Sequence, residues 1–276
     1  DVTAYIKQHT NALVELREDA CFKDSVMEAA MANQFGPDWR DALGYEKDAL
    51  VPYAVAAMIN YLHETQKHGV ERIKTVQNYA DAQYMRLSPV TRANLELTET
   101  MRGREKRGTL LWVLDKTETS MGKRLLRSWI EQPLVDAEAI NRRLSAVQAL
   151  YTANMARADL KEALSHVFDI ERLTTRILYG SATPREVKAL GDTCAMLPEV
   201  RSQAAACGAP LLKDLADQID PLEDILNKIT TALVDDPPAT LKDGGAIRAG
   251  YNSEVDELRD IMHGGKGYLS NLEAKY

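Results

Sequence analysis

Apolar residues at helical spacing recur through most of the chain. Their intervals of three and four residues place them on one face of a helix. The apolar residues between 140 and 177 predict one long helix or two helices in close succession. The whole pattern predicts a mainly α fold with a multi-helical core of long packed helices. The runs are Ile140, Leu144, Val147 and Leu150; Leu160, Leu164, Val167, Leu173 and Ile177; Val187, Leu190, Cys194 and Leu197; Leu222, Ile225, Ile229 and Leu233.

Three segments carry the signals of a helix start. Ser88-Pro89 combines a capping residue with proline at the first helical position and predicts a helix through Leu95. Thr183-Pro184-Arg185-Glu186 has the spacing of a capping box, and Asp220-Pro221-Leu222-Glu223 repeats it with aspartate as the cap. Pro237-Pro238 and Gly244-Gly245 predict a break before Ile247.

The first third of the chain is less regular. We expect a helix over 24–35 that ends at Gly36-Pro37, a polar connection over 38–50, and a helix over 52–66. The side chains of that second helix that should face the core are Val55, Met58, Ile59 and Leu62. Weak alternation of apolar and polar residues over 73–87 predicts a short two-stranded β element.

The C-terminal end shows a narrower pattern. Six apolar residues and one glycine follow one another at alternating intervals of three and four residues over three heptads. This spacing is typical of a helix that packs against one partner helix along a narrow seam. The positions are Val255, Leu258, Met262, Gly265, Leu269, Leu272 and Tyr276. The helix either packs back on its own domain or is one strand of a long helical hairpin. Gly264, Gly265 and Gly267 should weaken, bend or fray it, at about 1 kcal/mol each.

Composition excludes several classes of protein. The chain is 45% hydrophobic and has no apolar run of membrane-spanning length, so we expect neither wide disorder nor a membrane span. Its net charge of -7 argues against strong DNA binding. Residues 101–130, however, carry eight basic and three acidic side chains. We expect weak phosphate contacts from the loop residues Arg102, Arg104, Lys106 and Arg107, or else a solvated surface loop.

Motifs for catalysis are absent from the sequence. It has no phosphate-binding loop, dinucleotide fingerprint, zinc-protease motif or nucleophile elbow. His63 and His68 are five residues apart, which does not place two metal ligands on one helix face. Cys21, Cys194 and Cys207 lack metal-ligand spacing and indicate reduced thiols of an intracellular protein. We therefore predict no catalytic, cofactor-binding or metal-binding residue in this chain.

Several short blocks occur in a fixed order along the chain. They begin at Tyr61-Leu62, Thr65-Gln66-Lys67, Arg86-Leu87-Ser88-Pro89, Gly108-Thr109-Leu110-Leu111-Trp112, Thr119-Ser120-Met121-Gly122-Lys123-Arg124, Trp129-Ile130-Glu131-Gln132-Pro133, Gly250-Tyr251-Asn252 and Asp256-Glu257-Leu258-Arg259. Taken together, over about residues 50–276, these blocks resemble the core, or lever, domain of the MutS family of DNA mismatch-repair ATPases. The family often has aspartate in place of Ser88 and a proline near Ser120, but Ser88 and Thr119 can still cap the two helices.

The resemblance implies an order of parts. Residues 1–45 would be the tail of a connector domain, 46–70 a linking helix, and 71–249 the first half of the core. Residues 250–276 would start a lever helix toward a clamp domain that this chain lacks. Both ends are then expected to be boundaries within a longer protein.

It also implies a function for the longer parent. The parent would be a cytoplasmic DNA-dependent ATPase that uses ATP and Mg²⁺, with no membrane association. Its partners would be mismatched double-stranded DNA, a second copy of itself and a MutL-type protein. The resemblance places the ATPase, mismatch-recognition and clamp motifs outside this chain, so the chain alone is expected to be no enzyme and to hold no cofactor.

The expected role of this segment is mechanical. Long packed helices would transmit between the ATPase and the DNA clamp as a rigid lever. Trp112, Leu114, Leu125, Leu126 and Trp129 would then pack near a hinge rather than take part in catalysis. Two alternatives stay open at this point: a MutS-like paralogue that acts in recombination without mismatch recognition, and an unrelated helical scaffold that binds a protein.

Overall fold

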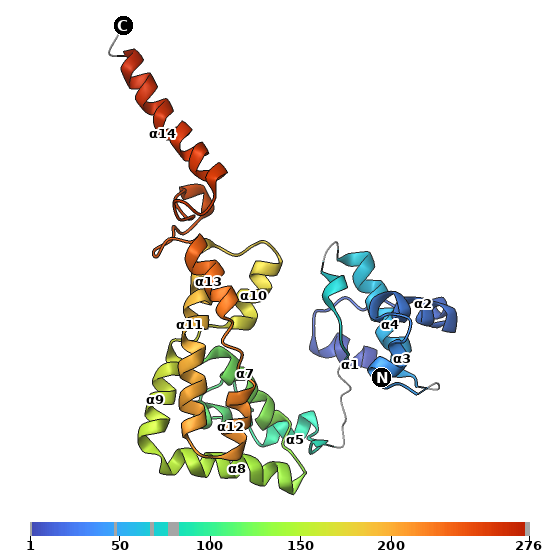
Figure 1. Cartoon of the computed structure of the whole chain (residues 1–276). Coiled ribbons are helices and arrows are strands. Elements are labelled where there is room, and N and C mark those ends of the chain that lie inside the picture. The colour runs from blue at the N-terminus through green and yellow to red at the C-terminus, as the bar shows by residue number, and fades with distance from the viewer. Residues whose placement is uncertain (1, 47–48, 67–68, 77–82, 274–276) are drawn as a thin grey trace. The chain divides into compact units, whose positions relative to one another are not determined.

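The computed structural model describes residues 2–46, 49–66, 69–76 and 83–273, and for 2, 5, 8, 9, 263 and 265–273 it describes the backbone alone. Contacts divide the chain into two units, residues 1–79 and 80–276, and each is considered by itself. The structure is mainly α, as the periodicity predicted (Figure 1). No helix in the described ranges is both long and apolar enough to cross a membrane.

The first unit is built around two helices. Its core consists of Met27, Ala30 and Met31 from α2, Trp39, and Ala56 from α4. The α2 helix ends at Gly36, where the sequence predicted. The elements are α1 (Val2–His9), η1 (Asp19–Phe22), α2 (Asp24–Phe35), α3 (Trp39–Leu43), α4 (Val51–Thr65) and η2 (Val70–Arg72).

Two predictions for this unit were wrong in detail. The expected polar connection over 38–50 contains α3, and Trp39 is only 2% exposed. A five-residue helix is too short to show a period, so its one large apolar side chain gave no pattern. In α4, Ala56 and Ile59 are buried, whereas Met58 is 65% exposed, because the inward face follows Pro52, Ala56 and Ile59 at intervals of four and three.

The second unit contains the remaining helices. Its long α11 packs against α9, α10, α12 and α13 and forms the centre of the unit (Figure 1). The first two apolar runs belong to three helices, α8, α9 and α10, rather than one or two. The elements are α5 (Pro89–Asn94), α6 (Leu110–Leu114), α7 (Ser120–Glu131), α8 (Ala137–Thr152), α9 (Asn154–Ser165), α10 (Ile170–Leu178), α11 (Pro184–Ala206), α12 (Pro210–Asp217), α13 (Glu223–Ala232), η4 (Leu241–Asp243) and α14 (Ser253–Glu273).

Side-chain caps fix most of the helix starts as predicted. The Ser88 side chain accepts a hydrogen bond from the Thr91 amide, and Thr119 caps α7 through the Gly122 amide. Thr183 and Glu186 form the expected capping box of α11. The predicted box at Asp220 is wrong, because Leu222 adopts a left-handed backbone (φ 53°) and α13 begins only at Glu223.

Close packing around α11 holds the second unit together. A methyl group on Gly191 would lie 2.8 Å from Cγ2 of Ile229, so α13 sits where only a glycine leaves room. Buried Thr193 accepts a hydrogen bond from the Phe168 amide at 3.1 Å and donates to the Ala189 carbonyl at 2.9 Å. These contacts join α13 and the start of α10 to the same turn and a half of α11.

Strand pairing in the described ranges is limited to isolated bridges. Tyr84 pairs with Leu134 in an antiparallel bridge, so the chain around residue 84 pairs with a distant segment. Residues 73–76 form no strand, and 77–82 lie outside the described residues. A second bridge joins Leu233 to Ile247 across the predicted break.

Candidate functional site

The basic loop predicted from the sequence is a closed turn. The Thr100 amide donates to the Glu105 carbonyl at 3.0 Å, and the Thr100 hydroxyl accepts from the Glu105 amide at 3.0 Å. Gly103 and Arg104 both have positive φ values, 86° and 51°, which let the chain reverse. The turn therefore presents its basic side chains from a fixed backbone.

A helix cap secures the end of this loop. Thr109 is 1% exposed, and its hydroxyl donates to the Lys106 carbonyl at 2.7 Å while accepting from the Trp112 amide at 3.1 Å. The next turn buries Leu111 beside the chain that precedes the loop, because the Leu111 amide donates to the Leu97 carbonyl at 2.9 Å. The loop is thus anchored at both of its ends.

The carboxylate of Asp115 forms ion pairs with two lysines near the loop. Oδ2 of Asp115 lies 2.8 Å from Nζ of Lys106 and 3.4 Å from Nζ of Lys123. Its Oδ1 accepts a hydrogen bond from the Thr117 hydroxyl at 2.8 Å. The hydrogen bond from Lys106, followed by that from Thr117, holds the pKa of Asp115 well below its usual range. The same bond raises the pKa of Lys106.

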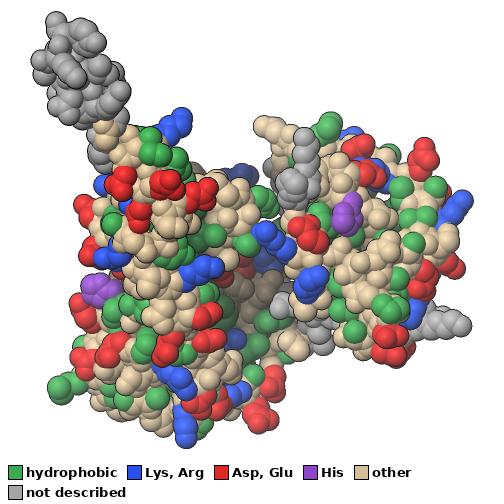
Figure 2. Space-filling model, turned by 45° about the horizontal axis from the view of Figure 1, so that its top comes forward, with side chains coloured by type: hydrophobic (Ala, Val, Ile, Leu, Met, Phe, Trp, Pro, Cys, Tyr) green, Lys and Arg blue, Asp and Glu red, His purple; other side chains and the backbone are tan. Residues whose placement is uncertain are grey.

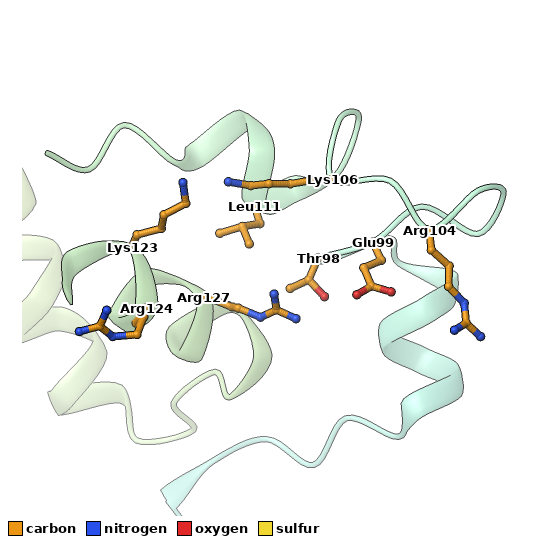
Figure 3. Close-up of a pocket in the computed structure, with 8 residues that line it drawn as sticks. All are labelled: Thr98, Glu99, Arg104, Lys106, Leu111, Lys123, Arg124 and Arg127. Carbon is orange, nitrogen blue, oxygen red and sulfur yellow. The ribbon is translucent and has the colours of Figure 1, made fainter. Parts of the chain in front are cut away.

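Lys106 and Lys123 line an open pocket of about 350 Å³. The ammonium groups of Lys106 and Lys123 point toward each other, and the guanidinium of Arg127 points toward Thr98 (Figure 3). Arg124 turns away from them, because it binds Asp169 and Glu171. We call this hollow the cationic pocket; it is lined by Thr98, Glu99, Arg104, Lys106, Leu111, Lys123, Arg124 and Arg127.

The pocket only partly matches the residues chosen from the sequence. Arg104 and Lys106 line it, whereas Arg102 and Arg107 are exposed outside its lining. Sequence reasoning missed Lys123 and Arg127 of α7. Their spacing of four residues, directly after the Thr119 cap, places them on one face of a helix and was the signal that could have found them. The predicted phosphate contacts stay a prediction.

Charges of both signs are mixed on the face that Figure 2 shows. On the face drawn in Figure 2, Lys and Arg side chains lie among Asp and Glu side chains. That face offers no wide surface of one sign, such as a DNA duplex would need. This mixture agrees with the net charge of -7 of the sequence.

A second feature is the fixed base of α14. Nη2 of Arg259 donates to the Ile247 carbonyl at 2.5 Å, and its Nη1 lies 3.0 Å from Oδ1 of Asp256. The other oxygen of Asp256 accepts from the Gly250 amide at 2.7 Å, and Asn252 caps the helix through the Val255 amide at 3.1 Å. These bonds tie the first turns of α14 to the segment that precedes it.

Beyond this base, the described part of α14 exposes its apolar residues. Leu258, Ile261 and Met262 are between 58% and 72% exposed. The helix is uninterrupted from Ser253 to Glu273 and passes through all three glycines. The predicted seam is thus a helix, and the heptad positions from 265 onward have no described side chains.

The predicted hinge residues do not form a buried cluster within this chain. Trp112, Leu114, Leu125 and Trp129 are 41–53% exposed, and Leu126 is half-buried. The guanidinium of Arg143 stacks on the Trp129 ring at 3.7 Å. Packing near a hinge stays a prediction for the longer protein.

Groups that could support metal binding or thiol chemistry are few. Among the described residues, no three His, Cys, Asp or Glu side chains gather as a metal site. Cys194 and Cys207 are buried, and burial raises the pKa of both thiols. A second open pocket, of about 500 Å³ in the first unit, is lined by Cys21, His63 and Glu64, and Arg17 pairs with Glu64 at 2.7 Å.

Fold and sites together define a class: a multi-helical scaffold domain with a locally cationic pocket and a helix fixed at its base. Residues 90–274 match the family model described as MutS domain III. The chain belongs to the MutS family.

Relatives carry the same assignment over nearly the whole chain. A DNA mismatch repair protein MutS of Alkaliphilus oremlandii is 41% identical over 268 residues, 97% of this chain and 30% of the relative. The protein of the same name from Ruminiclostridium cellulolyticum is 41% identical over 274 residues, 99% of this chain and 31% of the relative. The chain thus spans about 30% of the length of these curated relatives.

Proposed function

We propose that this chain is the lever segment of a MutS-type DNA mismatch repair protein. It would transmit mechanically between an ATP-hydrolysing part and a DNA-gripping part of the longer protein. The observation that carries this proposal is the 41% identity, over 97% of the chain, to a protein named for mismatch repair. The names of the relatives favour mismatch repair over a recombination paralogue, and family membership excludes an unrelated scaffold.

The contacts of the second unit support a mechanical role. Arg124 joins α7 to the start of α10, Thr193 joins the start of α10 to α11, and Gly191 seats α13 on α11. The bridge between Leu233 and Ile247 then leads to the base of α14. An unbroken series of packed elements of this kind can move as a rigid body.

The remaining expectations belong to the longer protein. We propose ATP with Mg²⁺ as its cofactors, and mismatched double-stranded DNA, a second copy and a MutL-type protein as its partners. We also propose a cytoplasmic location. The 276-residue chain itself is proposed to be no enzyme, because its sequence has no catalytic motif and its described residues hold no group of three possible metal ligands.

The base of α14 offers the sharpest test. In the full reading frame, Arg259→Ala removes the bonds to Asp256 and the Ile247 carbonyl. We expect ATP hydrolysis and mismatch binding to persist separately, while ATP-driven release from DNA slows, because the lever is no longer fixed at its base. Stopped-flow measurement of DNA release, with steady-state ATPase rates, distinguishes these effects.

Arg201→Ala is the matched control, since Arg201 is an exposed arginine of α11. Equal release rates in wild type and Arg259→Ala would contradict the lever role. A parent that binds mismatched and matched duplexes equally would instead favour the recombination paralogue.

A further inference from the structure

The cationic pocket holds more positive charge than its own carboxylates neutralise. Five of its lining side chains are basic and one, Glu99, is acidic. Arg124 is committed to Asp169 and Glu171, outside the pocket. Lys106 and Lys123 share a single oxygen of Asp115, so two ammonium groups face one negative charge. A surplus of positive charge therefore remains inside the hollow.

Arg127 of α7 also lines the hollow. Its Nε donates to Glu131 at 2.9 Å, which leaves the end of the guanidinium directed into the hollow toward Thr98 (Figure 3). The Nζ atoms of Lys106 and Lys123 lie 2.8 and 3.4 Å from the same oxygen of Asp115, and Arg127 lines the same hollow of about 350 Å³. Lys106, Lys123 and Arg127 are thus close enough to act on one bound anion.

We propose that the cationic pocket binds a small multivalent phosphate anion, such as inorganic triphosphate, through Lys106, Lys123 and Arg127. Ammonium and guanidinium groups make charge-assisted hydrogen bonds to phosphate oxygens. The volume of about 350 Å³ is at the lower end of the range for small-ligand sites. This site is independent of the proposed lever function.

The shape and lining of the pocket favour a free polyphosphate over nucleic acid. The groups converge from facing walls, the loop on one side and α7 on the other, rather than lying along a flat surface (Figure 3). No aromatic side chain lines it, so a base would gain no stacking. A nucleoside attached to the phosphates should add little to binding.

Calorimetric titration of the 276-residue chain tests the proposal. The probes are sodium triphosphate, ATP and a duplex oligonucleotide at constant ionic strength. The variants are Lys123→Gln and Arg127→Gln, whose own side chains are half exposed. The matched control is Lys116→Gln, an exposed lysine outside the lining that changes the net charge equally.

We expect saturable binding of triphosphate with one site per chain. Each pocket variant should weaken it by about tenfold, the typical effect of one charge-assisted hydrogen bond. Lys116→Gln should leave it unchanged, and ATP should bind no more tightly than triphosphate. Thermal melts of every variant establish that the fold is retained.

Three results would overturn the proposal. The first is no saturable binding of triphosphate. The second is an equal loss of affinity in Lys116→Gln, which would indicate only general charge attraction. The third is duplex binding that triphosphate does not displace, which would assign these side chains to a nucleic-acid backbone.

Discussion

Arg124 and Asp169, 45 residues apart, meet in a two-bonded ion pair. Nη1 and Nη2 of the arginine lie 2.7 and 2.9 Å from the two carboxylate oxygens. The same Nη2 also contacts Glu171. Asp169 is at the same time the cap of α10, through the Arg172 amide. One arginine of α7 thus holds the N-terminal turn of another helix.

Replacing this arginine by lysine should loosen the joint. Lysine in Arg124→Lys keeps the charge but has one ammonium group, which cannot span both oxygens of Asp169. We expect a lower Tm and faster amide exchange in the first turn of α10, measured by hydrogen-exchange mass spectrometry. Arg142→Lys is the control, since Arg142 binds Asp214 through a single contact. Equal effects of the two substitutions would contradict the role of the two-bonded geometry.

Two glycines should respond to alanine in opposite directions. In Gly191→Ala the new methyl meets buried Ile229 at 2.8 Å, and overpacking of about 1–3 kcal/mol should exceed the gain of about 1 kcal/mol in helix propensity. Gly264 has no heavy atom within 4 Å of the same position, so Gly264→Ala should stabilise α14 by about 1 kcal/mol. Urea unfolding measures the first and helical circular dichroism the second. A stabilised Gly191→Ala would show that α13 can move away freely.

The hydroxyl of Thr193 should contribute more to stability, as a hydrogen-bond acceptor, than the volume of the side chain does. Thr193→Val keeps the volume of this buried side chain but removes the acceptor of the Phe168 amide, which costs about 1–3 kcal/mol. Thr193→Ser keeps the acceptor. Hydrogen exchange of the Phe168 amide, followed by NMR, should therefore accelerate in the valine variant alone. Similar protection in both variants would mean that another group satisfies the amide.

The elements with local signals were the ones that the sequence predicted well. Ser88, Thr119 and Thr183 cap their helices through bonds that span three residues, so the signal lies within one short segment. The family resemblance rests on such segments too. Asn252, Asp256 and Arg259, quoted there as motif residues, proved to be the cap and the ion pair at the base of α14.

The features that were missed depend on contacts between distant segments. Trp39 is buried by α2 and α4, and Tyr84 pairs with Leu134. Residue spacing within one short segment predicts neither contact. In the pocket, Lys123 joins Lys106 only because both reach Asp115 across the turn between α6 and α7. Leu222 entered a left-handed conformation that a capping pattern does not predict.

The carboxylate of Asp115 should make stability depend on pH in the acid range. Its pKa is lowered in the folded state by the hydrogen bonds from Lys106 and Thr117, relative to about 3.9 for an unfolded aspartate. The unfolded state therefore binds a proton more readily. The stabilising contribution is fully present at neutral pH, begins to fall near the unfolded pKa, and is lost as the pH drops through the folded value. Urea unfolding between pH 7 and pH 3 measures this fall.

Asp115→Asn should be less stable at pH 7 and should lose stability less steeply below about pH 4, because the amide does not titrate. Asp236→Asn, an exposed aspartate between α13 and η4, is the control and should keep the wild-type slope. The shared oxygen of Asp115 explains the direction, since protonation would leave Lys106 and Lys123 facing each other without a counter-charge. A wild-type slope in Asp115→Asn would place the acid sensitivity elsewhere, with Asp169, whose pKa Arg124 also lowers, as the next group to replace.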